Sequence, residues 1–267
     1  YRKIARWTTN AIAAAALVLA TIVLIYALQA RRQADLQIWH TQAPQLEMTA
    51  ADIGPDFSLA QYREREDALF AEVRATLAAS IPAEEQVLGN RYWSGSPNSQ
   101  WSFATDWNQT FELTPAEPRG GALLLHGLTD SPYSLRTIAR ALHARGYYVL
   151  VLRLPGHGTI PASLERATWQ DWLAATSLGA RTVRGTIGDA LPFVMVGYSN
   201  GAALTIRHQL DALGDPTLPR ADRIVLLSPM IGLSPTAALS RVLDSLSFMP
   251  YFRKSAWTDV QLEFNPF

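Results

Sequence analysis

A serine at position 199 lies between two glycines, in the run Gly-Tyr-Ser-Asn-Gly at 197–201. In this G-x-S-x-G pattern, a sharp turn from a strand into a helix holds the serine in a strained conformation and exposes its hydroxyl for nucleophilic attack. The pattern needs an apolar strand before it and a helix after it, and residues 193–196 and 202–206 fit those two elements. Ser199 is therefore the candidate nucleophile, and a serine with a purely structural role in a turn is the alternative.

Two other glycine-containing runs also follow apolar segments. His-Gly-Leu-Thr-Asp-Ser at 126–131 comes after 122–125, and Leu-Pro-Gly-His-Gly at 154–158 comes after 147–152. With the run at 197–201, and in this order and spacing, they make the chain resemble the α/β-hydrolase superfamily. The resemblance is greatest to its monoacylglycerol-lipase and serine-aminopeptidase-like branch, and it covers roughly residues 111–233.

The resemblance implies a role for each matching position. Ser199 would be the nucleophile, and the backbone N–H groups of Leu128 and Asn200 would form the oxyanion hole. The side chains of His126 and His157 would support the loops around the site rather than take part in the reaction. No metal or cofactor is assigned, because no pair of histidines has a metal-binding spacing such as H-E-x-x-H.

A serine hydroxyl reacts only when a base takes its proton, and in this superfamily an acid and then a histidine follow the serine. His208 is the only histidine after Ser199, on the same predicted helix, where it should point away from the strand ends. No candidate acid follows a later core strand; the candidates are Asp211, Asp215, Asp222, Asp244, Asp259 and Glu263. We therefore expect the catalytic acid and histidine beyond residue 267, and expect residues 1–267 alone to be inactive.

The elements that must position these loops alternate between strands and helices. Continuous apolar strands that alternate with helices are typical of a doubly wound, mostly parallel sheet that is buried on both faces. Functional sites in such sheets lie at the carboxyl ends of the strands. The fold class is therefore α/β, an incomplete α/β-hydrolase fold. We expect strands at 110–113, 122–125, 147–152, 193–196 and 224–227, and helices at 131–145, 168–184 and 200–213.

Composition excludes several classes of function. The chain has 23 basic and 23 acidic residues, so it lacks the basic excess that a nucleic-acid partner would need. It has no cysteine, which excludes disulfides, thiolate metal sites and cysteine nucleophiles. An apolar fraction of 48% is ordinary for a folded domain with a core. Nothing in the composition indicates an oligomeric state.

An uncharged, apolar run extends from 11 to 28 and has basic residues on both sides. A helix of about this length crosses a bilayer. We predict a membrane anchor within 1–35, a single-pass transmembrane helix over 7–30; a cleaved signal peptide and a buried core helix are the alternatives. Three basic residues before the run and two after it favour a bacterial inner-membrane protein with its catalytic domain on the periplasmic side.

Two further segments flank the core, which we place at 111–233. In the extension at 36–110, residues 59–79 predict an amphipathic helix whose charged run at 63–67 would face solvent. Residues 234–267 predict the start of a lid with a helix at 235–246, whose apolar stripe would either face an acyl group or pack on the core. The extension also holds three tryptophans that either pack in the domain or stack on sugars, Trp93, Trp101 and Trp107.

These observations favour a membrane-anchored serine hydrolase that cleaves a carboxylic ester by acyl transfer, with a monoacylglycerol or lysophospholipid as substrate. An aminopeptidase, a thioesterase or a haloperoxidase-like enzyme would use the same scaffold, since a fold does not decide function. A pseudo-hydrolase that serves as a binding module is the non-enzymatic alternative. The intact Gly197, Ser199 and Gly201 argue against it.

Overall fold

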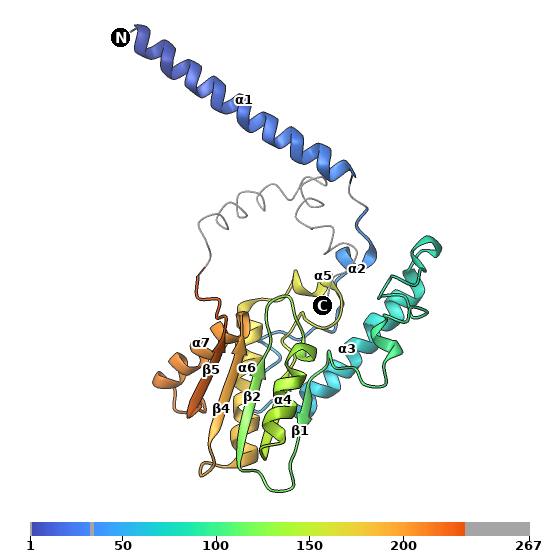
Figure 1. The fold of residues 1–267 in the computed structure, drawn as a ribbon, viewed down its shortest axis with the longest axis vertical. Helices are drawn as coiled ribbons and strands as arrows, with labels where there is room; N and C mark the ends of the chain where they lie inside the picture. The colour runs from blue at the N-terminus through green and yellow to red at the C-terminus, as the bar shows by residue number, and fades with distance from the viewer. Residues whose placement is uncertain (1, 33–34, 233–267) are drawn as a thin grey trace. The chain divides into compact units, whose positions relative to one another are not determined.

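The computed structural model describes residues 2–32 and 35–232. Residues 37–232 belong to one compact unit, built on a five-stranded sheet (Figure 1). The first helix, α1 (Arg2–Arg32), belongs to a separate unit. The predicted lid at 234–267, with the helix expected at 235–246, lies outside the described residues.

The strands of the sheet stand in the order β1–β3–β2–β4–β5, and all but β1 run parallel. In the register, Leu125 pairs with both Leu152 and Gly197, so β2, β3 and β4 end side by side. The three loops that carry the predicted site therefore lie together at the carboxyl ends of these strands. The strands are β1 (Phe111–Leu113), β2 (Gly120–Leu125), β3 (Tyr147–Leu152), β4 (Phe193–Tyr198) and β5 (Arg223–Leu227).

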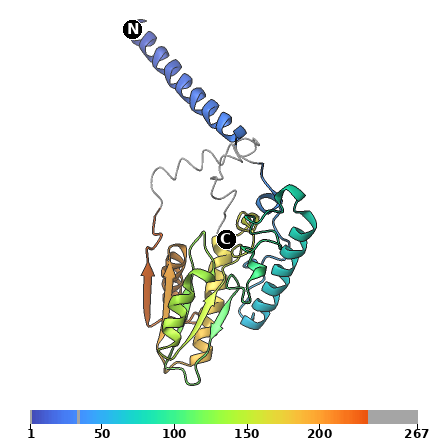
Figure 2. The same cartoon turned by 45° about the vertical axis from the view of Figure 1, so that its right-hand side comes forward.

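Helices cover both faces of the sheet (Figures 1 and 2). Alternate residues of β2 point to opposite sides: Leu123 and Leu125 pack with α6 (Trp169–Ile187) and α7 (Asn200–Gly214), whereas Leu124 packs with α4 (Arg136–His143). All six residues of β2 are buried. Burial on both faces is the reason that the strands are continuous apolar runs, and it confirms the predicted α/β architecture.

The helix predicted at 131–145 begins differently from the expectation. Its first turn is a 3-10 helix, η3 (Pro132–Leu135), and the α-helix α4 starts only at Arg136. Pro132 has no N–H to donate and fits only the first turn of a helix. The chain leaves α4 through Gly146, whose φ of 86° favours a residue without a side chain.

The segment before the sheet is part of the same unit and shares its apolar core. Its long helix, α3 (Leu59–Ser80), begins at a capping box in which Ser58 and Gln61 bond each other's backbone N–H groups. A second apolar cluster joins this helix to α2 (Ile38–Thr41) and to the short α5 (Pro161–Leu164). Trp93 and Trp101 pack against this cluster, as the packing alternative predicted. Two 3-10 turns complete the segment, η1 (Ala83–Glu85) and η2 (Gln100–Ser102).

Only part of the membrane-anchor prediction agrees with the structure. The segment is helical over Arg2–Arg32, as its many alanines and leucines favour. Within residues 2–32 and 35–232, however, no helix is both long enough and apolar enough to cross a membrane. The transmembrane helix predicted over 7–30 is therefore not supported.

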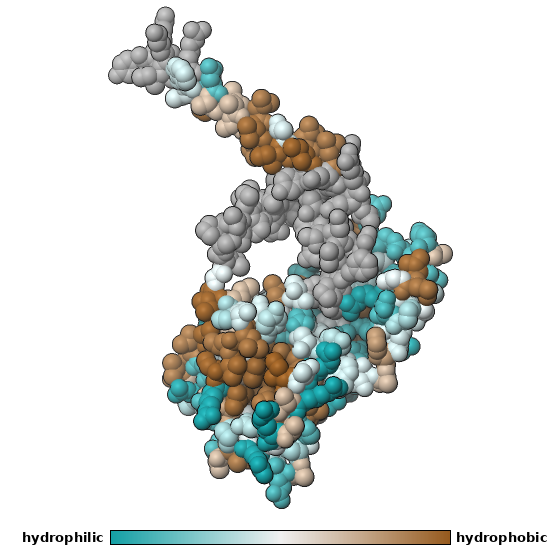
Figure 3. All heavy atoms as spheres, in the orientation of Figure 1, coloured by the Kyte–Doolittle hydropathy of each residue, from teal (hydrophilic) through white to brown (hydrophobic). Residues whose placement is uncertain are grey.

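One of the two outermost strands of the sheet is β5. Among the described residues, β5 has a neighbouring strand on one side only, namely β4. Apolar side chains gather over β5 and β4 in the space-filling view (Figure 3), and Ile224 and Val225 are 42% and 44% exposed. This edge is the least buried part of the sheet, in contrast to β2, which lies at its centre.

Candidate active site

The turn between β4 and α7 has the strained backbone that the G-x-S-x-G run predicts. Ser199 has φ 51° and ψ −109°, and α7 begins at the next residue. A β-carbon on Gly201 would overlap the carbonyl oxygens of Leu125 and His126, and one on Gly197 would overlap Ala202. Gly201 is therefore required by the close approach of α7 to the end of β2, and Gly197 by the close approach of the start of α7 to β4.

The side chain of Ser199 is half-buried, and within the described residues its hydroxyl has no hydrogen-bond partner. The loop after β2 lies beside it: a β-carbon on Gly127 would be 3.4 Å from Ser199 Cβ and 3.1 Å from the Tyr198 ring. The structure thus brings the loop of Gly127 and Leu128 to the same place as the serine turn. The roles assigned to Ser199, Leu128 and Asn200 remain predictions.

The ring of His126 fixes the orientation of the peptide that carries the Leu128 N–H. Its Nδ1 lies 2.9 Å from the carbonyl oxygen of Gly127, and its Nε2 lies 3.1 Å from the Leu154 backbone N. Because the Leu154 N–H can only donate, Nε2 accepts and Nδ1 carries the proton. In a trans peptide the N–H points away from the C=O, so holding the Gly127 oxygen turns the Leu128 N–H to the opposite side.

The His126 ring is uncharged, as this hydrogen-bond pattern requires. Burial holds its pKa well below the usual value, and the neighbouring His157 lowers it further. The two rings meet edge to face, with their centroids 4.9 Å apart. With both ring nitrogens bonded to backbone groups, His126 is placed to support the loop, which is the role that the resemblance implied.

His157 supports the same loop from the other side. Its Nε2 lies 2.8 Å from the carbonyl oxygen of Leu128, and its Nδ1 lies 3.0 Å from that of Pro155. The Pro155 oxygen already accepts from Trp172 Nε1 at 2.9 Å. Burial lowers the pKa of His157, and the contacts with these two carbonyl oxygens oppose that effect.

No described residue after Ser199 is placed to act as its base. His208 is buried, and its ring contacts the Ser177 hydroxyl and the Pro219 carbonyl oxygen. The three described acids are also bound locally. Asp211 pairs with Arg207, Asp215 with Thr217, and Asp222 with Arg184. The remaining candidates, Asp244, Asp259 and Glu263, lie outside the described residues.

A cavity of about 570 Å³ lies next to the loop after β2. Asp130 and Ser131 line it from that loop, and Arg91, Asp106 and Trp107 line it from the segment before the sheet. Ser199 does not line it. Burial raises the pKa of Asp106, against the effect of the Asn108 N–H. Within residues 2–32 and 35–232, no group of three or more His, Asp or Glu side chains could hold a metal ion.

The sequence did not reveal three charged residues behind the loops, namely Glu47, Glu66 and Arg153. Arg153 follows β3 directly and is fully buried, and both glutamates bind its guanidinium. The charged run at 63–67 was expected to face solvent, which is wrong for Glu66, because its side chain points inward and is 2% exposed. A signal was present, since Glu66 lies four residues after Tyr62 and four before Phe70, on the buried stripe of α3.

Comparison with known proteins places this arrangement in a family. Residues 122–265 match the model described as the Alpha/beta hydrolase family. The chain is 35% identical over 130 residues to the thermostable monoacylglycerol lipase of Bacillus sp. (strain H-257), a match that covers 47% of this chain and 50% of the lipase. The chain thus spans about half the length of that relative.

Two lipolytic proteins are among the solved structures to which this chain is similar. One comes from a study of LipS and LipT, two metagenome-derived lipolytic enzymes, with 28% identity, a TM-score of 0.43, and 54% and 53% of the two chains covered. The other is a soluble variant of the monoglyceride lipase of Saccharomyces cerevisiae, with 16% identity, a TM-score of 0.39, and 53% and 49% covered.

Proposed function

Because the chain belongs to the α/β-hydrolase family, we propose that it is part of a serine hydrolase that cleaves carboxylic esters through Ser199. The observation that carries the proposal is the backbone of Ser199, with φ 51° between β4 and α7. This strained turn lies beside the Gly127 loop, which would face a reacting carbonyl. A serine in an ordinary turn would need neither the strain nor the two crowded glycines.

The proposed reaction is acyl transfer in two steps. The Ser199 oxygen loses its proton to a base and attacks the carbonyl carbon, while the N–H groups of Leu128 and Asn200 stabilise the oxyanion. The C–O bond to the alcohol then breaks, and the alcohol leaves with the proton. Water hydrolyses the acyl-enzyme in the second step. The base that this scheme requires lies outside the described residues.

The proposed substrate is a monoacylglycerol or another lipid-like ester. This is supported by the similarity to the Bacillus monoacylglycerol lipase over half of that protein. Localisation at a bacterial inner membrane remains a prediction from the sequence alone.

Hydrolysis assays on the full-length protein test the proposal. Ser199→Ala should lower ester turnover to the level of a blank, because no other group would form the acyl-enzyme. Ser228→Ala is a matched control, since Ser228 also follows a parallel strand and also has positive φ, 45°. It should leave turnover near that of the wild type. Equal turnover in Ser199→Ala and the wild type would refute the nucleophile, and cleavage of peptides without esters would refute the substrate class.

A further inference from the structure

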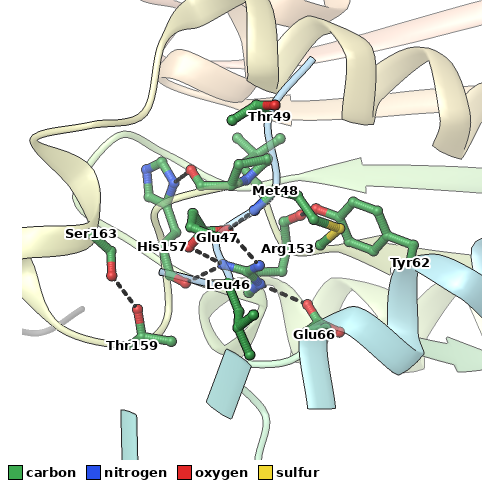
Figure 4. Close-up of polar contacts among 12 residues, drawn as sticks. Leu46, Glu47, Met48, Thr49, Tyr62, Glu66, Arg153, His157, Thr159 and Ser163 are labelled. Carbon is green, nitrogen blue, oxygen red and sulfur yellow. Dashed lines mark hydrogen bonds and ion pairs between the residues drawn. The ribbon is translucent and has the colours of Figure 1, made fainter. Parts of the chain in front are cut away.

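The guanidinium of Arg153 is held between two carboxylates from the segment before the sheet (Figure 4). Its Nη2 donates to Glu47 Oε1 at 3.0 Å, and its Nε donates to Glu66 Oε1 at 2.8 Å. The side chain of Arg153 is fully buried, and those of Glu47 and Glu66 are 11% and 2% exposed. The three side chains come from three places in the chain, a strap at 45–50, helix α3, and the end of β3.

Each glutamate is itself held in place. The carboxylate of Glu66 also accepts from the backbone N and the hydroxyl of Thr110, both at 3.0 Å. The strap that carries Glu47 is pinned on both sides. The Glu72 carboxylate accepts from the N–H groups of Gln45 and Leu46 at 2.7 and 2.9 Å, and Asp171 accepts from the N–H of Ala50 at 2.6 Å. The carboxylates thus reach Arg153 from fixed positions.

The clamped arginine acts on the loop at 154–158. Its Nη1 donates to the carbonyl oxygen of His157 at 2.9 Å, and its own carbonyl oxygen accepts from the Tyr62 hydroxyl at 2.7 Å. Its backbone N donates to Thr110 Oγ1 at 3.0 Å. The His157 ring in turn contacts the Leu128 carbonyl oxygen at 2.8 Å. A chain of contacts that passes through His157 therefore joins the carboxylate of Glu47 to the carbonyl of Leu128, in the peptide next to the one that carries the predicted oxyanion N–H.

This arrangement is an expensive way to obtain stability alone. Taking two carboxylates and a guanidinium out of water carries a large desolvation cost, and apolar side chains of similar volume often stabilise a fold as well or better. Burial raises the pKa of Glu66, and the Arg153 guanidinium opposes that rise. Apolar packing is not directional, whereas each hydrogen bond of the planar guanidinium fixes the position and orientation of its partner.

We propose that Glu47, Glu66 and Arg153 form a positioning clamp, through which the segment at 37–110 sets the orientation of the Leu128 backbone by way of His157. This role rests on the proposed function of the Leu128 N–H. The three residues touch no reacting atom, so they are positioning residues. The clamp makes the segment before the sheet a functional part of the hydrolase unit.

The test uses Glu47→Gln in the full-length protein, because this change removes one charge, keeps the shape, and affects a side chain near the surface. We expect kcat for ester hydrolysis to fall about tenfold with KM within about twofold, since a misplaced donor weakens the transition state and not substrate binding. Hydrogen exchange of the peptide containing residues 126–131 should become about tenfold faster. Glu66→Gln is the second variant, judged by the same two measurements if Glu47→Gln fails to fold.

Arg63→Gln is the matched control. Arg63 also joins α3 to the core through an ion pair, to Glu112 at 3.2 Å, but that pair is exposed and does not touch the loop of His157. This variant should change neither kcat nor exchange at 126–131. The clamp is refuted if Glu47→Gln folds with both quantities unchanged, or if Arg63→Gln changes them equally. If the wild type hydrolyses no ester, the proposed function fails, and exchange alone still decides whether the clamp orders the loop.

Discussion

Replacing His126 by alanine should weaken both the fold and the reaction, because this ring bonds two buried backbone groups. Its removal leaves the Gly127 carbonyl oxygen and the Leu154 N–H without these partners. Each buried group left unpaired costs about 1–3 kcal/mol, so the free energy of unfolding should fall by about 2–6 kcal/mol. Loss of orientation at Leu128 resembles loss of one oxyanion donor, and kcat should fall by about 10²–10³-fold.

Two replacements separate these effects. An asparagine amide can occupy the place of His Nδ1 and donate to Gly127, whereas a glutamine oxygen can occupy the place of Nε2 and accept from Leu154. We therefore expect His126→Asn to recover more of kcat than His126→Gln, and both to recover part of the stability. Urea unfolding gives the free energies, and ester hydrolysis at saturating substrate gives kcat. A folded His126→Ala variant with unchanged kcat would refute the orienting role.

Two further predictions concern stability at low pH and the glycine after Ser199 in the serine turn. Burial lowers the pKa of His126, His157 and His208 in the folded protein. Below about pH 6.5 the unfolded chain therefore binds more protons than the folded protein does. The free energy of unfolding should then fall by up to about 1.4 kcal/mol per pH unit for each histidine as the pH drops below this value. Urea unfolding between pH 7.5 and 5 checks this, and a midpoint that does not change would contradict it. Gly201→Ala should destabilise the fold by several kcal/mol, roughly 2–4, because its β-carbon would overlap two backbone oxygens that cannot move aside; a melting temperature equal to that of the wild type would contradict this.

Much of the fold follows from local patterns. The apolar runs in the strands and the periodic apolar residues in the helices show which positions are buried, because buried positions are filled by apolar side chains. The serine turn was predictable as well, since a tight strand-to-helix turn needs Gly197 against the start of α7, and the packing of α7 on the neighbouring strand β2 needs Gly201. The parallel sheet then placed the three glycine-containing loops together, at the carboxyl ends of β2, β3 and β4.

The clamp lay beyond local patterns, because its partners are far apart in sequence. Glu66 lies 87 positions from Arg153, and Glu47 lies 106 positions from it. A charged residue inside a charged run is usually solvated, and only the apolar neighbours of Glu66 on α3 indicated otherwise. An arginine at the end of a buried strand was the other available signal, since such a charge needs a partner.

The most direct test of Ser199 is the position at which a fluorophosphonate becomes attached to the full-length protein. The reagent reacts with a serine only where a base and an oxyanion hole activate it. Peptide mapping by mass spectrometry should find the adduct on Ser199, and Ser199→Ala should carry none. An adduct on another serine, or labelling that persists in Ser199→Ala, would contradict the assignment of Ser199 as the nucleophile.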